Sequence, residues 1–417
     1  MIHCLVMKIP QLKKNQKILL IAATTVLLIF ALGTSIALAA TKKPTVAFYN
    51  IPARDAEKIQ STIGTAVSYR TYPAELPLRK ELEQGAKPDL LIVPSGQALT
   101  DAKAVARVPL ATELFRDMTT SVRSLVQDRE KSAVALPLLS SHFEIAVNTQ
   151  ELKRTGVKTI NMWSDVERLA REASARNNSA IVFAGKDSTT LLDLLGAMTE
   201  AINGRQQYAN AVELIAIALD KVENGKQQLF STTTLAKTLC AAPDSPLHDS
   251  MRLLQHWFAD GLIFREVFSL DKNDVAALIG DKSASIVFMS LSDHRNLDRA
   301  MVEKYTSYYF PSSIPAPARA FTAPVYFAVP LKNNKALMAA TKQLVTAQKQ
   351  EALSRATGLA PVLTRCHTAD KQATDARHWV ASTNSPVAGL SRETALTKAQ
   401  RDALAQELGA LIRFGAF

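Results

Sequence analysis

Residues 133–147 read Ala-Val-Ala-Leu-Pro-Leu-Leu-Ser-Ser-His-Phe-Glu-Ile-Ala-Val, and residues 159–170 read Thr-Ile-Asn-Met-Trp-Ser-Asp-Val-Glu-Arg-Leu-Ala. A short apolar run ends at Pro137. A polar patch, Ser140 to His142, separates it from a second strand-like run, Phe143 to Val147. A helix that ends at Gly156 comes next, and Ser164 opens another after a loop. The pattern therefore predicts two short strands joined by a polar patch and followed by two helices.

Strands and helices alternate before this stretch. Predicted strands are Thr45–Tyr49, Val67–Tyr72 and Leu90–Val93, and predicted helices are Ala53–Thr62 and Leu78–Gln84. The run Leu90–Val93 is continuously apolar between two prolines, which is typical of a parallel strand covered on both faces. The alternation predicts an α/β lobe with a mainly parallel sheet.

The rest of the chain is richer in helices. Strands are predicted at Ala180–Ala184, Ser285–Met289 and Pro324–Pro330, and helices at Thr189–Ala201, Asn210–Val222, Pro246–Phe258, Asn273–Ile279, Asn334–Gln350 and Ser391–Ile412. We interpret the middle block as a second lobe inserted into the first. The expected divisions are 40–145 for lobe 1, 146–310 for lobe 2, and 311–417 for the return to lobe 1 with the C-terminal helices.

Five segments in this order resemble a family 1 extracellular solute-binding protein, the sugar-binding type of ABC importer subunit. They are Thr45–Glu57, Pro88–Leu99, Ala133–Ala170, Leu253–Met289 and Ala328–Pro361. The resemblance implies a two-lobed periplasmic-binding-protein-like fold of type II, with hinge crossovers between the lobes. It also implies that a small solute, a carbohydrate or polyol, is captured by hinge closure and delivered to a membrane permease. A monomer is expected.

The N-terminus is interpreted as a targeting segment. Four lysines precede an apolar run, Ile18 to Ala40, and Ala37-Leu-Ala39 is a signal-peptidase site. Residues 1–39 are therefore a signal peptide, the interpretation we favour, or an uncleaved membrane anchor. Either places the remaining chain outside the cytoplasm, in the periplasm or on the outer face of the membrane. Cys240 and Cys366 are expected to be unlinked.

Composition adds two restrictions. The net charge is +11, but the basic residues are scattered and form no run of five, so nucleic acid is not an expected partner. Sugar-binding members of the family usually set several aromatic rings in the cleft, whereas this chain has three Trp. Two of them, Trp163 and Trp257, occupy positions that look structural.

In two-lobed α/β proteins the ligand lies beyond the carboxyl ends of the strands, where loops and helix N-termini offer free N–H groups. Applied to the predicted strands, this rule gives twelve ligand-binding residues: Tyr49, Asn50, Ser95, Gln97, Ser141, His142, Lys186, Asp187, Ser290, Ser292, Phe321 and Tyr326. Some have other roles open to them. Ser95 and Ser188 suit helix caps, Tyr49 suits packing, and His142 suits a polar loop better than a metal site.

Two other classes of function stay open. An exported hydrolase needs a nucleophile and a base, but the chain has no Gly-x-Ser-x-Gly, no His-Glu-x-x-His and no phosphate-binding loop. A two-lobed scaffold or sensor without a transport role fits the low aromatic content and the anchor interpretation. We therefore assign no catalytic residue, no metal ligand and no cofactor.

Overall fold

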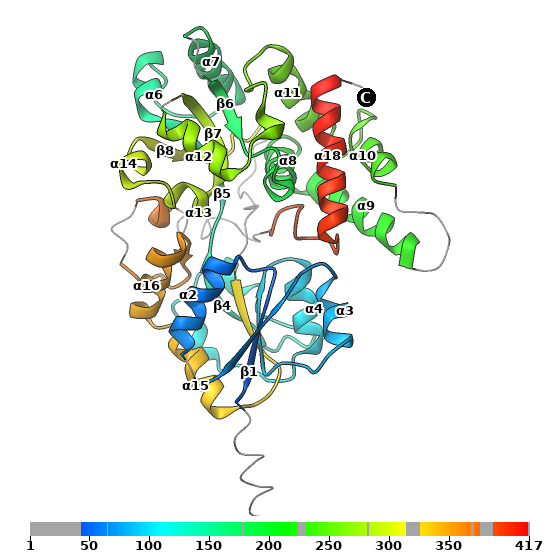
Figure 1. The fold of residues 1–417 in the computed structure, drawn as a ribbon, viewed down its shortest axis with the longest axis vertical. Coiled ribbons are helices and arrows are strands. Elements are labelled where there is room, and N and C mark those ends of the chain that lie inside the picture. The colour runs from blue at the N-terminus through cyan, green and yellow to red at the C-terminus, as the bar shows by residue number, and fades with distance from the viewer. Residues whose placement is uncertain are drawn as a thin grey trace, which may run out of the picture. The chain divides into compact units, whose positions relative to one another are not determined.

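Two β-sheets flanked by helices organise the chain from Thr45 onward (Figure 1). The strand order is β10-β4-β9-β3-β1-β2 in the first sheet and β6-β7-β5-β8 in the second. The strands are β1 Thr45–Tyr49, β2 Ser68–Tyr72, β3 Leu90–Pro94, β4 Leu136–Ser140, β5 Phe143–Asn148, β6 Ser179–Phe183, β7 Ala284–Ser290, β8 Tyr305–Tyr308, β9 Tyr326–Pro330 and β10 Ala360–Pro361. We call the first sheet with its helices lobe 1 and the second lobe 2.

The helices around lobe 1 come from both ends of the sequence. They are α2 Ala53–Ile63, α3 Leu78–Glu83, α4 Gln97–Val105, η1 Thr112–Phe115, α5 Thr120–Arg123, α15 Lys335–Gln343 and α16 Ala347–Thr357. The other helices are α6 Thr149–Thr155, α7 Trp163–Ser174, α8 Ser188–Asn203, α9 Arg205–Glu223, α10 Thr232–Cys240, α11 His248–Ala259, η2 Val267–Ser269, α12 Lys272–Gly280, α13 Leu291–Arg295, α14 Arg299–Val302 and α18 Lys398–Phe414.

This computed structural model describes residues 43–64, 66–176, 179–223, 231–281, 283–313, 326–367, 371–375 and 387–415. All of its helices and strands belong to the unit Thr45–Phe417. The predicted signal peptide or anchor, 1–39, lies outside the described residues and stays a prediction. No helix within the described ranges has both the length and the apolar character needed to cross a bilayer.

The two-sheet α/β fold is as predicted, and both sheets are mixed rather than mainly parallel. In lobe 1, β1 pairs in parallel with β2 and β3, whereas β9 pairs antiparallel with β3 and β4. In lobe 2, β6 and β7 are parallel, and β5 runs antiparallel to β7 and β8. The antiparallel pairs involve strands next to the connections between the lobes. β4 leads directly into β5, and β9 is the first strand of lobe 1 after the chain has passed through lobe 2.

The two lobes have separate apolar cores. Buried side chains of the first core come from residues 46–139 and 326–366, and those of the second from 143–310 and 390–412. The chain therefore changes sheets between Ser140 and Phe143, slightly before the expected division. Trp257 is fully buried in the second core and lies 5.9 Å from Trp163, between ring centroids. Cys240 and Cys366 are buried in different cores.

The C-terminal helix packs on lobe 2, a difference from the expected return of residues 311–417 to lobe 1. In Figure 1, α18 runs beside α8, α10 and α11, and its apolar residues join their core. The stripe Leu404, Leu408 and Leu411 recurs at helical spacing, so burial against these helices satisfies it. The helix begins at Lys398, because Thr397 and Gln400 form a capping box there, rather than at Ser391.

Replacing Leu408 by alanine tests this placement of α18. Leu408 is fully buried in the second core, so the substitution removes apolar contacts and leaves a cavity. We expect Leu408→Ala to lower the free energy of unfolding by about 2–5 kcal/mol, measured by denaturant titration. Gln406→Ala, on an exposed position of the same helix, is the control and should leave stability unchanged. Equal effects of the two substitutions would contradict the packing.

Candidate functional site

The loop after β3 meets the C-terminal segment, residues 387–397, at the carboxyl end of the first sheet. The backbone N–H of Gln97 donates to the carbonyl oxygen of Arg392 at 2.9 Å. Gly96 adopts φ +92°, and a Cβ there would lie 2.4 Å from that same oxygen. Glycine thus permits both the backbone conformation and the close approach. This hydrogen bond joins lobe 1 to a segment whose Leu390 and Leu396 belong to the core of lobe 2.

A small polar cavity lies between these elements. Its volume is about 20 Å³, roughly the space of one water molecule. Its polar lining residues are Tyr49, Asn50, Ser95, Gln97, Asp101, Ser391, Arg392, Thr394 and Arg401. The cavity therefore brings together four of the predicted site residues, Tyr49, Asn50, Ser95 and Gln97, with residues of the C-terminal segment and α18.

Four buried polar atoms lining this cavity have no hydrogen-bond partner among the described residues. They are Ser391 Oγ, Arg392 Nε, Thr394 Oγ1 and Arg401 Nε. Ser391 is 1% exposed and Thr394 is 6% exposed, so bulk solvent does not satisfy their hydroxyl groups. An unpaired buried donor or acceptor costs roughly 1–3 kcal/mol. Their concentration at one place makes this cavity the candidate site for polar groups of another molecule.

Burial sets the ionisation of the cavity lining. It raises the pKa of Tyr49 to about 12, and the phenol donates to the carbonyl oxygen of Leu76 at 2.9 Å. Burial also raises the pKa of Asp101, whose carboxylate accepts from Gln97 Nε2 at 2.7 Å. The pKa of Arg401 is lowered, first by burial and then by the positive charge of Arg392. Both arginines line the cavity, and Arg401 Nη1 donates to the carbonyl oxygen of Leu396 at 3.1 Å.

A second polar group surrounds Tyr326, which is 3% exposed on β9. Its hydroxyl donates to Asp55 Oδ2 at 3.0 Å. Burial raises the pKa of Asp55, although this hydrogen bond opposes the shift. The charge of Asp293 in lobe 2 also raises the pKa of Asp55, and Asp293 lies 3.1 Å from Lys272 Nζ. Tyr326 therefore sits in a network of charges contributed by both lobes.

Two further predicted residues, Asp187 and Ser290, cap helices in lobe 2. Asp187 accepts from Thr190 N at 2.7 Å and begins α8. Ser290 accepts from Asp293 N at 3.2 Å and begins α13, and its hydroxyl lies 3.0 Å from that of Ser292. Lys186 is exposed and lines a separate cavity of about 540 Å³ beside α18. Phe321 lies outside the described residues.

Ser141 and His142 form the crossover between β4 and β5, and both are buried. His142 Nε2 lies 2.5 Å from one carboxylate oxygen of Glu144, and His294 Nδ1 lies 2.5 Å from the other. Ser307 Oγ donates to that second oxygen at 3.0 Å. Burial opposes ionisation of Glu144, but the charge of His294 and hydrogen bonds from both imidazoles hold its pKa below the usual range. The imidazole of His142 is thus engaged in the core.

The residues after His294 tie this cluster to lobe 1. Arg295 Nη1 donates to the carbonyl oxygen of Leu359 at 2.6 Å. Asn296 Oδ1 accepts from Arg54 Nη2 of α2 at 2.7 Å. The end of α13 therefore links the buried cluster of lobe 2 with two elements of lobe 1.

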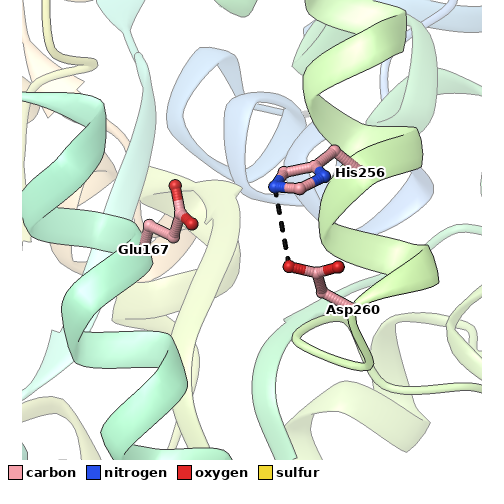
Figure 2. A group of neighbouring side chains, drawn as sticks. All are labelled: Glu167, His256 and Asp260. Carbon is pink, nitrogen blue, oxygen red and sulfur yellow. Dashed lines mark ion pairs between the residues drawn. The ribbon is translucent and has the colours of Figure 1, made fainter.

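One group of three described side chains has metal-ligand spacing. Figure 2 shows Glu167 on α7 facing His256 and Asp260 at the end of α11, with the His256–Asp260 pair dashed. Arg171 Nη2 lies 2.6 Å from an oxygen of Glu167 and 2.6 Å from one of Asp260. The guanidinium already pairs with both carboxylates, so we assign no metal to this group.

Another cavity, of about 750 Å³, contains none of the predicted residues. Its walls come from α14, β8, α16 and residues 371–375. The charged groups there pair with one another, as in Arg299 with Glu303 and Lys371 with Asp375. The cavity beside Gly96 differs because four buried polar atoms of its lining residues lack partners among the described residues.

Sequence reasoning missed the residues contributed by the C-terminal segment and α18. Ser391, Arg392 and Thr394 fell within a predicted helix, and Arg401 gave no local signal. Asp55 and Asp101 were also missed, because both lie inside helices, where acidic residues are common on exposed faces. These residues can be recognised only once the fold shows which distant segments pack together.

The geometry can be compared with known proteins. The chain resembles the bacterial solute receptor AcbH, which prefers β-D-galactopyranose, with a TM-score of 0.66 and 14% identity over 90% of this chain and 95% of that one. It has the fold of the two-lobed solute-binding receptors. A binding protein of Bacillus subtilis, MsmE, in an open conformation has a TM-score of 0.66 and 13% identity, covering 89% and 94% of the chains.

A third structure, a sugar transporter of Bacillus licheniformis in complex with stachyose, has a TM-score of 0.63 and 13% identity over 88% and 94%. No protein-family model matches the chain, and no curated protein matches it by sequence. The resemblance drawn from the sequence is therefore confirmed at the level of the fold.

Glu144→Gln tests the buried cluster at the crossover. The lowered pKa of Glu144 means that its charge stabilises the fold above the unfolded carboxyl pKa of about 4.3, and that this stability is lost as pH falls through the folded pKa. At pH 7 we expect a loss of about 3–5 kcal/mol, measured by denaturant unfolding. The difference in free energy of unfolding between Glu144→Gln and the parent chain should become smaller below pH 4. The exposed Glu303→Gln is the control, and equal Tm values for both variants would refute the assignment.

Proposed function

We propose that this chain is the substrate-binding subunit of an ABC importer, capturing a small polar solute between its two lobes. The cluster of unpaired buried polar atoms at Ser391, Arg392, Thr394 and Arg401 carries the proposal. These atoms lie beyond the carboxyl ends of β1 and β3, the position where open α/β sheets bind ligands. The two-lobed fold supports the same function.

Hinge closure is the mechanism we propose. The short crossover Ser141–His142 lets lobe 2 turn relative to lobe 1, and the contact between Gln97 and Arg392 forms when the lobes approach. A solute that bonds to both sides favours the closed state by its differential affinity. No covalent bond is made or broken, and the function requires no cofactor, metal or nucleic acid.

A carbohydrate or polyol is the solute class that we propose. AcbH and the Bacillus licheniformis transporter are named for sugar ligands. Solute hydroxyl groups both donate and accept, so they match the hydroxyls of Ser391 and Thr394 and the donors of the two arginines. The chain would act as a monomer outside the cytoplasm, held or exported through residues 1–39, and pass its solute to a membrane permease.

A scaffold or sensor without transport is the second candidate. The observation in its favour is the cavity volume of about 20 Å³, which does not admit a sugar in this conformation. A transport subunit must open and close around a solute, whereas a scaffold needs no such movement.

Solute-dependent compaction distinguishes the two. We expect the full chain to show a higher Tm and a smaller radius of gyration by small-angle X-ray scattering when one solute from a panel of sugars and polyols is added. A solute at a hundredfold excess over its Kd stabilises the folded state by about 2.7 kcal/mol. Absence of any shift across the panel would contradict transport and favour the scaffold.

A methyl group at position 96 should hold the lobes apart. The Cβ of Gly96→Ala meets the carbonyl oxygen of Arg392, so closure requires the C-terminal segment to move. We expect the Kd of a bound solute to rise at least tenfold and the solution radius to increase. Gly156→Ala is the matched control, since its φ is also positive (+66°) but nothing lies within 4 Å of the added Cβ. Equal solute binding by the two variants would show that this contact plays no part in closure.

A further inference from the structure

Most of the cavity-lining atoms that lack a hydrogen-bond partner are donors. Arg392 Nε and Arg401 Nε can only donate, and the hydroxyl of Thr394 is free to donate as well, whereas the hydroxyl of Ser391 also interacts with Asp193. All four belong to residues that line the same space. A molecule that satisfies them must therefore present several acceptor atoms close together.

The neighbouring carboxylates are engaged elsewhere. Each accepts a hydrogen bond within the protein: Asp101 from Gln97 at 2.7 Å, Asp193 from the backbone of Ser391 at 3.2 Å, and Asp402 from Ser188 at 2.6 Å. Arg392 forms no ion pair within 4.0 Å with any described acidic residue. Burial raises the pKa of Asp193 to about 6, and the positive charge of Arg392 opposes this shift, so Asp193 is the nearby counter-charge of Arg392.

Aromatic stacking contributes little to this space. Among the described residues that line it there is no tryptophan, and Tyr49 is the single aromatic residue; its hydroxyl is already bonded to the carbonyl oxygen of Leu76. Recognition of a neutral sugar usually combines a ring face with hydrogen bonds to hydroxyl groups. Here two guanidinium groups take the place of the rings, and guanidinium matches the geometry of carboxylate and phosphate oxygens.

We infer that the solute is anionic, a sugar acid, polyol acid or phosphorylated polyol whose carboxylate or phosphate oxygens accept from Arg392 and Arg401. The inference rests on the proposed function and names its substrate class. In the closed state the acidic group lies where Ser391 and Thr394 supply hydroxyl donors, and the remaining hydroxyl groups of the solute reach Asn50, Ser95 and Gln97. The lobes must separate for such a molecule to enter, since the present cavity holds about one water.

Isothermal titration calorimetry with the full chain tests the charge requirement. The probes are matched pairs: glucuronate with glucose, gluconate with sorbitol, and glycerol 3-phosphate with glycerol. We expect one acidic member to bind at least tenfold more tightly than its neutral partner, with affinity falling as salt rises. The carboxylate and phosphate pairs identify which acidic group is used.

Variants connect that binding to the two arginines. Arg392→Gln removes one charge and should weaken binding of the acidic probe about tenfold to a hundredfold. Arg392→Lys keeps the charge and should retain more affinity than the Gln variant, which separates recognition from a folding defect. Arg299→Gln, whose side chain is 93% exposed on α14, is the matched control and should bind as the parent chain does.

The outcomes separate this inference from the proposed function. Tighter binding of a neutral member overturns the anionic inference while leaving a solute-binding function standing. Binding of an acidic probe that Arg392→Gln and Arg401→Gln do not weaken also overturns it. Failure of every probe, acidic and neutral, counts against both the inference and the importer function.

Discussion

A fully buried carboxylate at the start of the second sheet constrains how the two lobes are joined. Glu144 directly follows the crossover, and an ionised carboxylate cannot be buried without partners. Its partners come from the crossover, from α13 and from β8, through His142, His294 and Ser307. Because Arg295 bonds to lobe 1, the helix that neutralises the carboxylate also fixes one edge of the contact between lobes.

The C-terminal segment, residues 387–397, connects the core of lobe 2 with the cavity. Leu390 and Leu396 anchor its two ends in the core of lobe 2, and the polar residues between them face lobe 1. Gly389, at φ +86°, leaves room for Asp193, which accepts from the backbone of Ser391. The apolar residues thus hold the segment on lobe 2, and its unpaired polar groups face lobe 1. The position of Gly96 then determines how closely the loop of lobe 1 approaches them.

Local patterns predicted most of the elements but not their pairing. The apolar run of β3 and the strand–helix alternation identified lobe 1, because continuous burial leaves a continuous apolar signature. Tyr49, Asn50, Ser95 and Gln97 could be placed from strand ends alone. Ser391 to Leu396 could not, since its alanine and leucine spacing resembles a helix while tertiary anchoring holds it in turns and bends. Glu144, within Phe-Glu-Ile-Ala-Val, gave no signal because its partners are 150 or more residues away or across the crossover.

In the mechanism that we propose, the unpaired donors and the hinge together account for the direction of the conformational change. Closing the lobes without a solute buries groups that have lost water and gained no acceptor, at roughly 1–3 kcal/mol each. The like charges of Arg392 and Arg401 oppose closure further. A solute that supplies acceptors and negative charge relieves both costs only in the closed state, which is the differential affinity that a population shift requires. The same feature that makes the empty closed form unfavourable therefore makes closure depend on the solute.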